Sequence, residues 1–109
     1  MTEAEFDKLA TATLEALREA LEASAAELDL QEKGAGVLEL EFDDGSKMVV
    51  NRHGAAREIW VAARSGGFHF RWQEGAWRDT RDGSELFAAL SKLISAQGGV
   101  AVVLAPPRG

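Results

Sequence analysis

Two spacings of apolar residues divide the chain into helical ends and a strand-rich middle. Residues 3–23 lack Gly and Pro, and their apolar positions recur every three or four residues, which predicts an amphipathic helix. Thr2 and Glu5 have the spacing of a capping box at its start. The stripe expected to be buried is Phe6, Leu9, Thr13, Leu17 and Leu21.

From residue 27 onward the apolar period falls from about 3.6 to 2, which is typical of β-strands. Glycine-containing turns separate the alternating runs, and "DDGS" at 43–46 is a hairpin signal. The runs predict about six short antiparallel strands: "ELDLQ", "VLELEF", "KMVVNR", "REIWVAA", "FHFRW" and "AWRDT".

A second helical spacing follows the strands. Ser84 is the predicted N-cap, and the apolar stripe is Leu86, Phe87, Leu90, Leu93 and Ile94. "GG" at 98–99 ends the helix, and the following "VAVVLA" predicts a short edge strand. We expect one domain over residues 1–109, with a frayed tail at 105–109.

This order of elements predicts an α+β fold, a two-layer sandwich with both helices on one face of an antiparallel sheet. The other face of the sheet is then open. Ile59, Val61, Phe68, Phe70 and Trp72 should lie beneath the helices. The residues expected on the open face are Glu39, Glu41, Lys47, Val49, Asn51, Glu58, Trp60, Ala62, His69, Arg71 and Arg78. A one-residue bulge would reverse these assignments.

Composition narrows the function classes. The net charge of −6 argues against nucleic-acid binding, and no apolar run is long enough to span a bilayer. The acidic N-terminus argues against a secretory or transit signal. Cysteine is absent, which favours a reducing compartment and excludes thiolate chemistry. Residues 1–45 carry 13 acids against 3 bases, whereas the remainder is mildly basic, so an interaction surface is expected at one end.

Two features carry candidate chemistry, although no catalytic motif is present. Glu15, Glu19 and Glu22 fall on one face of the first helix, and Glu27, Asp29 and Glu32 follow on the first strand. Such carboxylates suit hard cations such as Mg, Ca, Mn or iron. The alternative is a solvated face that aids solubility. His53 and His69 lie on different segments and share no motif, which favours ordinary loop or sheet-surface positions for both.

Trp60 is the second feature. A Trp on an open sheet beside Asn and Arg has the composition of a protein-binding hot spot. The alternative is an indole shielded by an edge or a loop.

The segments "EFDKLA", "GVLELEF", "DGSKMVVNR", "REIWVAA", "SGGFHF" and "SELFAAL", in this order and spacing, resemble the bacterial frataxin family of CyaY-type proteins. The resemblance covers nearly the whole chain. It implies a cytoplasmic bacterial protein that binds Fe2+ and Fe3+ weakly and exchangeably, without an organic cofactor. It also implies docking on the cysteine desulfurase of iron–sulfur cluster assembly, with the scaffold protein as a further candidate partner.

The resemblance also assigns residues by position. An acidic ridge would comprise Glu19, Glu22, Glu27 and Asp29, with Glu15 and Glu32 nearby and the hairpin tip Asp43 and Asp44 adjoining. Partner contacts would involve Asn51, Arg52 and Trp60, together with Glu19 and Glu22 of the ridge. His53 stands where the family usually has Gln, so an imidazole there could contact a partner or add a metal ligand.

The leading hypothesis is therefore an iron-binding regulator or iron donor in cluster assembly, without catalytic turnover and expected to be monomeric. Iron-dependent oligomerisation is left open. Two alternatives remain, a ferroxidase or iron-storage activity at the carboxylates and a protein-interaction module indifferent to iron.

Overall fold

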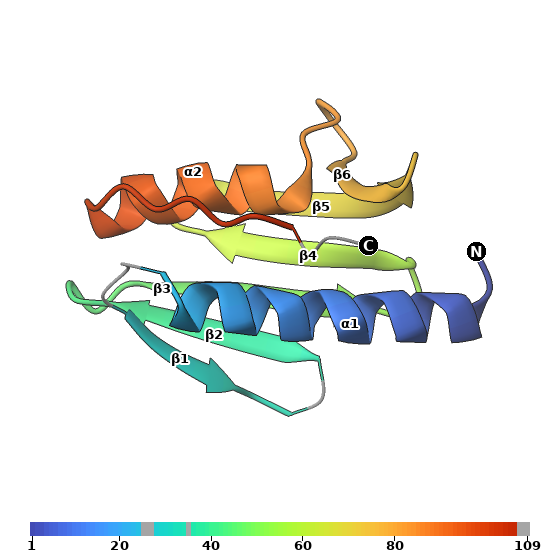
Figure 1. Ribbon diagram of the computed structural model, residues 1–109, viewed down its shortest axis with the longest axis horizontal. Coiled ribbons are helices and arrows are strands. Elements are labelled where there is room, and N and C mark those ends of the chain that lie inside the picture. The colour runs from blue at the N-terminus through green and yellow to red at the C-terminus, as the bar shows by residue number, and fades with distance from the viewer. Residues whose placement is uncertain (25–27, 35, 107–109) are drawn as a thin grey trace.

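The computed structural model describes residues 1–24, 28–34 and 36–106. Two helices pack against one face of a six-stranded antiparallel sheet (Figure 1), which confirms the predicted α+β sandwich. No helix among the described residues is long and apolar enough to cross a membrane. In chain order the elements are α1 (Glu3–Glu22), β1 (Leu28–Glu32), β2 (Val37–Phe42), β3 (Lys47–His53), β4 (Glu58–Ala63), β5 (Gly66–Gln73), β6 (Ala76–Asp79) and α2 (Leu86–Gly98).

The sheet is a simple meander in which each strand pairs with its neighbours in the sequence, in the order β1-β2-β3-β4-β5-β6. In β3 and β4, Asn51 lies opposite Trp60 and Val50 opposite Val61. In β4 and β5, Trp60 lies opposite His69 and Ile59 opposite Phe70. No bulge interrupts these ladders, so the alternation predicted from the sequence is preserved across the centre of the sheet.

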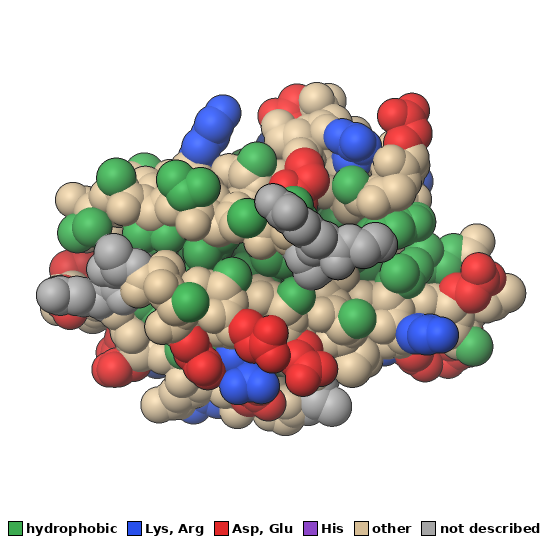
Figure 2. All heavy atoms as spheres, viewed as in Figure 1, with side chains coloured by type: hydrophobic (Ala, Val, Ile, Leu, Met, Phe, Trp, Pro, Cys, Tyr) green, Lys and Arg blue, Asp and Glu red, His purple; other side chains and the backbone are tan. Residues whose placement is uncertain are grey.

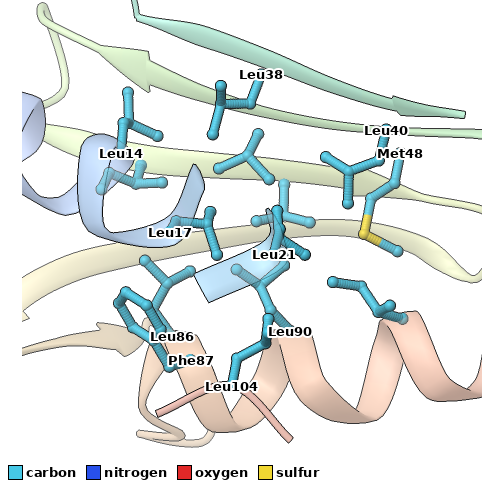
Figure 3. Close-up of a cluster of buried hydrophobic side chains, with 14 of the residues drawn as sticks. Leu14, Leu17, Leu21, Leu38, Leu40, Met48, Leu86, Phe87, Leu90 and Leu104 are labelled. Carbon is cyan, nitrogen blue, oxygen red and sulfur yellow. The ribbon is translucent and has the colours of Figure 1, made fainter. Parts of the chain in front are cut away.

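The core fills the space between the helices and the covered face of the sheet. Figure 3 shows leucines of α1 and α2 pointing toward side chains of β2 and β3, with Met48 among them. Phe6, Leu17, Ile59, Phe70 and Leu90 are fully buried. Burial of apolar surface stabilises the fold by roughly 25 cal/mol per Å², so this single layer of contacts fixes both helices on one face.

The cap of α1 is confirmed and the cap of α2 is corrected. Thr2 Oγ1 accepts a hydrogen bond from Glu5 N at 3.1 Å, and Glu5 Oε1 accepts one from Thr2 N at 3.0 Å. For α2 the N-cap is Glu85, whose carboxylate accepts from the backbone N–H groups of Phe87 and Ala88. Ser84 N instead donates to Asp82 Oδ1, which places Ser84 in the preceding turn.

The predicted edge strand after α2 is not formed. Residues 101–106 run in an irregular path along α2, where Val102 and Leu104 are buried in the core. Two serines of α2 accept hydrogen bonds from the backbone of this segment. Ser95 Oγ accepts from Val102 N and Ser91 Oγ accepts from Leu104 N, both at 2.8 Å. Residues 107–109 of the predicted tail lie outside the described residues.

Candidate functional site

Trp60 lies on the open face of the sheet, as the alternation predicts. Its neighbours in β4, Ile59 and Val61, are buried beneath the helices, whereas Trp60 is half-buried. The same parity places Asn51 and His69 beside it on the open face, since these residues are its partners across the two ladders. The expected open-face row therefore exists as a continuous surface over β2 to β5.

Two imidazoles sandwich the Trp60 indole. The His53 ring stacks on one side with a centroid separation of 3.8 Å and an interplanar angle of 12°. The His69 ring stacks at 4.6 Å and 11°. We call His53, Trp60 and His69 the ring stack. Its two histidines are separated by the indole, so they are not placed to share a metal ion.

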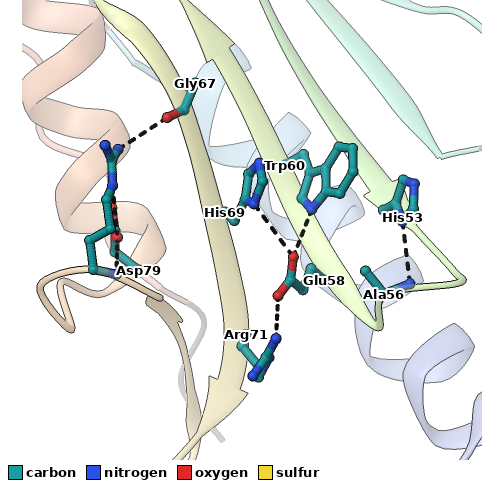
Figure 4. Close-up of polar contacts among 9 residues, drawn as sticks. His53, Ala56, Glu58, Trp60, Gly67, His69, Arg71 and Asp79 are labelled. Atoms are coloured by element: carbon teal, nitrogen blue, oxygen red, sulfur yellow. Dashed lines mark hydrogen bonds and ion pairs between the residues drawn. The ribbon is translucent and has the colours of Figure 1, made fainter.

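The Glu58 carboxylate contacts two members of the ring stack, Trp60 and His69. Figure 4 shows its carboxylate between Trp60, His69 and Arg71. Trp60 Nε1 donates to Glu58 Oε1 at 2.8 Å, and Arg71 Nη2 donates to Oε2 at 2.7 Å. Burial favours a higher pKa for Glu58, but the hydrogen bonds from Trp60 and Arg71 and the Arg71 charge outweigh it, so its pKa is lowered. The carboxylate therefore remains ionised and holds the indole in place.

Arg52 does not share the open face with Asn51 and Trp60. Its position in β3 points it to the helix-covered side, where its guanidinium pairs with Asp7 and donates to Thr11 Oγ1 at 2.8 Å. The same group lies 5.4 Å from the centre of the Phe6 ring. Arg52 thus joins the end of the sheet to α1, and of the predicted partner residues only Asn51, His53 and Trp60 form one surface.

The predicted acidic ridge separates into two groups, and Glu27 lies outside the described residues. The helix-side group surrounds a basic side chain, as Figure 2 shows over α1 and β1. Arg18 pairs with Glu22 at 3.1 Å and with Glu32 at 3.0 Å. Glu15 lines a hollow together with Arg18 and Glu32. Glu19 is exposed on the same helix.

The hairpin group lies at the other end of β1 and β2. Asp29 is directly opposite Glu41 in the ladder, and both line an open hollow with Asp43. Two like charges facing each other across a ladder destabilise a sheet, so a cation at this position would relieve repulsion. Asp44 is engaged elsewhere, because it pairs with Arg64 and accepts from Ser46 N. The hydrogen bonds from Ser46 and Arg64 lower the pKa of Asp44 to about 2.

Within residues 1–24, 28–34 and 36–106, no three acidic or histidine side chains are close enough to hold a metal ion together. A cation on these surfaces would therefore meet one or two carboxylates and complete its shell with water. Hard oxygen ligands are present, but a closed coordination shell is not formed by the described residues.

Three residues of these surfaces were not singled out as site residues from the sequence. Glu41 was assigned to the open face, but its position opposite Asp29 depends on strand register. Glu58 and His69 were also placed on that face, yet their contacts with Trp60 require three strands to be paired. The alternation predicts which face of the sheet each residue occupies, but only the register of the strands identifies its neighbours.

Comparisons with known proteins agree on one family. Residues 1–100 match the model of the frataxin-like domain. The chain is 56% identical over 104 residues to the iron-sulfur cluster assembly protein CyaY of Dechloromonas aromatica, covering 95% of this chain and 99% of that protein. It is 52% identical over 108 residues to the protein of the same name from Herminiimonas arsenicoxydans, covering 95% and 96% of the two chains.

Solved structures show the same architecture. Frataxin from Psychromonas ingrahamii matches with a TM-score of 0.87 and 31% identity, over 96% of this chain and 99% of that chain. Trimeric frataxin from the yeast Saccharomyces cerevisiae, in complex with ferrous iron, matches with a TM-score of 0.65 and 26% identity, over 91% and 88%.

Proposed function

Because this chain belongs to the frataxin-like family, we propose that it regulates iron–sulfur cluster assembly in the bacterial cytoplasm, binding iron without catalytic turnover. The name of its relatives from Dechloromonas aromatica and Herminiimonas arsenicoxydans supports the role in assembly. One observation carries the site assignment: two clusters of carboxylates, the helix-side group and the hairpin group, lie on the surface of α1, β1 and β2.

The iron would be cargo or a regulatory ion, held weakly and exchangeably. The ferrous complex of yeast frataxin supports this part of the proposal. Asp29, Glu41 and Asp43 line one hollow, where one or two of their carboxylates would supply the hard oxygen atoms that suit ferrous or ferric iron. Since no closed shell is present among the described residues, water would occupy the remaining positions. On the helix side, Arg18 competes for the carboxylates of Glu22 and Glu32.

The protein partner would be the cysteine desulfurase, with the scaffold protein as a second candidate. An acidic surface on this chain would meet a basic surface on the desulfurase, so association would be steered electrostatically and weakened by salt. Glu19 and Glu22 are both exposed, and a basic partner would compete with Arg18 for the Glu22 carboxylate. Iron on neighbouring carboxylates would partly neutralise them, so iron occupancy would tune partner affinity.

Charge reversal tests the docking surface. The double substitution Glu19→Lys with Glu22→Lys should abolish desulfurase binding in a low-salt calorimetric titration, because it places two cations on the face that meets a basic partner. The matched control is Glu3→Lys with Glu74→Lys, which changes the net charge equally at two exposed positions outside the acidic groups. Equal affinity for wild type and the Glu19/Glu22 variant would refute the docking assignment.

Iron binding is tested separately by titrating Fe2+ while recording residue-resolved NMR spectra. We expect broadening at Asp29, Glu41 and Asp43 and on the exposed face of α1, with no change at His53. Broadening at His53 would instead reveal a second site. Oxygen consumption during the same titration distinguishes binding from ferroxidase activity, because only an enzyme gives a rate that Asp29→Asn with Glu41→Gln abolishes.

A further inference from the structure

A hollow of about 340 Å³ lies between α1 and the adjoining ends of β1 and β2, whose arrangement Figure 1 shows. Its walls include Glu15 and Arg18 of α1, Glu32 at the end of β1, and Arg52 of β3. We call it the α1–β2 hollow. Sites for small molecules usually have volumes of roughly 300–1,000 Å³, so this hollow has the size for one small ligand.

The floor of the hollow is apolar. Leu14 and Leu38 line it and belong to the buried core, and Val37 beside them is half-buried. An alkyl group lying on these three side chains would lose contact with water on that side, which favours binding. The floor therefore suits a ligand with an apolar portion.

Two arginines reach the hollow, and each is held in place by other contacts. Arg52 pairs with Asp7 and donates to Thr11 Oγ1 at 2.8 Å. Arg18 lies about two helical turns beyond Thr11 and pairs with Glu32 at 3.0 Å. The two arginine side chains are 21% and 35% exposed, so water screens their charges only partly. Neither guanidinium uses all five of its N–H donors in these contacts, so donors remain for the carboxylate of a ligand.

Two carboxylates line the same hollow. Glu15 is exposed and makes no ion pair within the described part of the chain. Glu32 pairs with Arg18 through Oε1, and its side chain is 61% exposed, so its carboxylate can accept a further donor. Two arginines and two glutamates leave the lining without net charge. A purely anionic ligand would meet the carboxylates and a purely cationic ligand would meet the guanidinium groups, so the lining favours a ligand that carries both charges.

We propose that the α1–β2 hollow binds a free α-amino acid with an apolar side chain. The ligand carboxylate would accept hydrogen bonds from Arg18 and Arg52. Its ammonium group would donate to Glu15 and Glu32, and its side chain would lie on the apolar floor. This site goes beyond the function proposed above, because binding requires neither iron nor a protein partner.

The test titrates L-leucine into the full chain labelled with 15N, at about pH 6.5, where an α-amino group with a pKa near 7.7–8.0 is charged. Three analogues each lack one feature: N-acetyl-L-leucine the ammonium, L-leucinamide the carboxylate, and glycine the apolar side chain. L-Leucine should give saturable shifts of the amides of Thr11–Arg18 and of Val37 and Leu38. Each analogue should bind about five-fold or more weakly, because charged hydrogen bonds or apolar contacts are lost.

The analogues also separate a free amino acid from the end of a peptide. N-Acetyl-L-leucine represents a C-terminal residue, and L-leucinamide represents an N-terminal residue. Tighter binding of either analogue than of L-leucine would assign the hollow to a chain end and overturn the proposal.

The glutamate is tested by Glu15→Gln, which should weaken L-leucine binding about two- to five-fold, as expected for one exposed charged contact. Binding of N-acetyl-L-leucine should not change, because this analogue has no ammonium group. The matched control is Glu3→Gln, which removes the same charge from an exposed position of α1 outside the hollow.

The arginine is tested by Arg18→Gln, which should weaken the binding of L-leucine and N-acetyl-L-leucine alike and leave that of L-leucinamide unchanged. Arg64→Gln is its control, because it removes the same charge from an exposed residue that pairs with Asp44. Amide spectra verify that all four variants remain folded.

Equal binding of L-leucine and either analogue that lacks a charge would overturn the proposal. Shifts confined to residues away from the hollow, or no saturable shift, would overturn it as well. These titrations contain neither iron nor desulfurase. Their failure would leave the Glu19/Glu22 result standing, and failure of desulfurase binding would leave the amino-acid result standing.

Discussion

The imidazole of His53 lies flat against the indole of Trp60, with ring centroids 3.8 Å apart and planes 12° apart. The contact is diagonal across the ladder, since His53 is opposite Glu58 and Trp60 is opposite Asn51. His69 covers the other side of the indole from the next strand. Three strands therefore hold one aromatic unit, and the ring stack depends on their pairing.

Replacing His53 with Ala should expose one face of Trp60. An aromatic pair contributes about 0.5–1.5 kcal/mol beyond its buried area, and for this half-buried pair we expect a loss of about 0.5 kcal/mol in the free energy of unfolding. In NMR spectra the Trp60 ring protons should move downfield, because the imidazole no longer shields them. Trp72 and Trp77 protons should not move. Unchanged Trp60 protons would contradict the stack.

Glu58→Gln should lower the free energy of unfolding at pH 7 by about 1.5–3 kcal/mol, the usual value of hydrogen bonds to a charged group. The neutral amide keeps the shape but loses the charge that attracts Arg71. Urea unfolding monitored by circular dichroism measures the difference. Glu74→Gln, in the exposed β5–β6 turn, is the control and should leave stability unchanged.

The effect of Glu58 should also depend on pH. Its pKa is lowered in the folded state from the ordinary 4.5, so the unfolded chain binds more protons just below that pH. The stabilisation is therefore complete above about pH 4.5 and disappears as the pH falls through the lowered pKa. The difference in the free energy of unfolding between wild type and Glu58→Gln should therefore shrink as the pH is lowered. A gap that stays constant to low pH would contradict this assignment.

Gly36→Ala should destabilise the protein more than Gly34→Ala. Both glycines have positive φ, +80° and +70°, which costs another residue about 1 kcal/mol or more. At Gly34 a Cβ would meet open space, whereas at Gly36 it would lie 2.1 Å from Arg52 Cδ. The added methyl must displace Arg52 from Asp7, so we expect a total loss of about 2–3 kcal/mol by thermal unfolding. Equal losses of stability in the two variants would show that the Arg52 side chain can move aside without cost.

Ser91→Ala with Ser95→Ala should release the segment after α2. The hydroxyls accept from the backbone N–H groups of Leu104 and Val102, and each lost acceptor for a buried donor costs about 1–3 kcal/mol. Amide exchange of residues 101–105 should accelerate, while that of β3 and β4 is maintained. Ser65→Ala, in an exposed turn, is the control. Unchanged exchange would mean that burial of Val102 and Leu104 alone holds the segment.

The sheet could be predicted from the sequence because its alternation is unbroken. Ile59, Trp60 and Val61 occupy the faces that their parity assigns. The start of α2 was predicted one residue early, because Ser84 and Glu85 both follow "DG" and either side chain can cap a helix. The segment after α2 has the apolar content of a strand, but the Ser91 and Ser95 hydroxyls replace a neighbouring strand as its partners.

The contacts within the candidate site were harder to predict from the sequence than the sheet was. Its carboxylates were recognised by type and spacing, but the sequence did not indicate that Arg18 pairs with Glu22 and Glu32 or that Arg64 pairs with Asp44. Only the Arg18–Glu22 pair has a local signature, the i,i+4 spacing on a helix. Arg18 and Glu32, and likewise Arg64 and Asp44, are distant in the sequence. The ring stack likewise joins His53 and His69, which were independent surface histidines until the register of three strands brought them together.

The order of the strands along the sheet also has a kinetic consequence. Every pair of neighbouring strands is joined by a short connection, so the sheet requires only the closure of small loops. Proteins rich in such local contacts fold faster than those that must join distant segments. We expect the hairpins to form early, and α1 and the segment after α2 to dock later, since each must reach across the chain. In stopped-flow experiments the Ser91/Ser95 double variant should then unfold faster than the wild type, while its refolding rate should be almost unchanged.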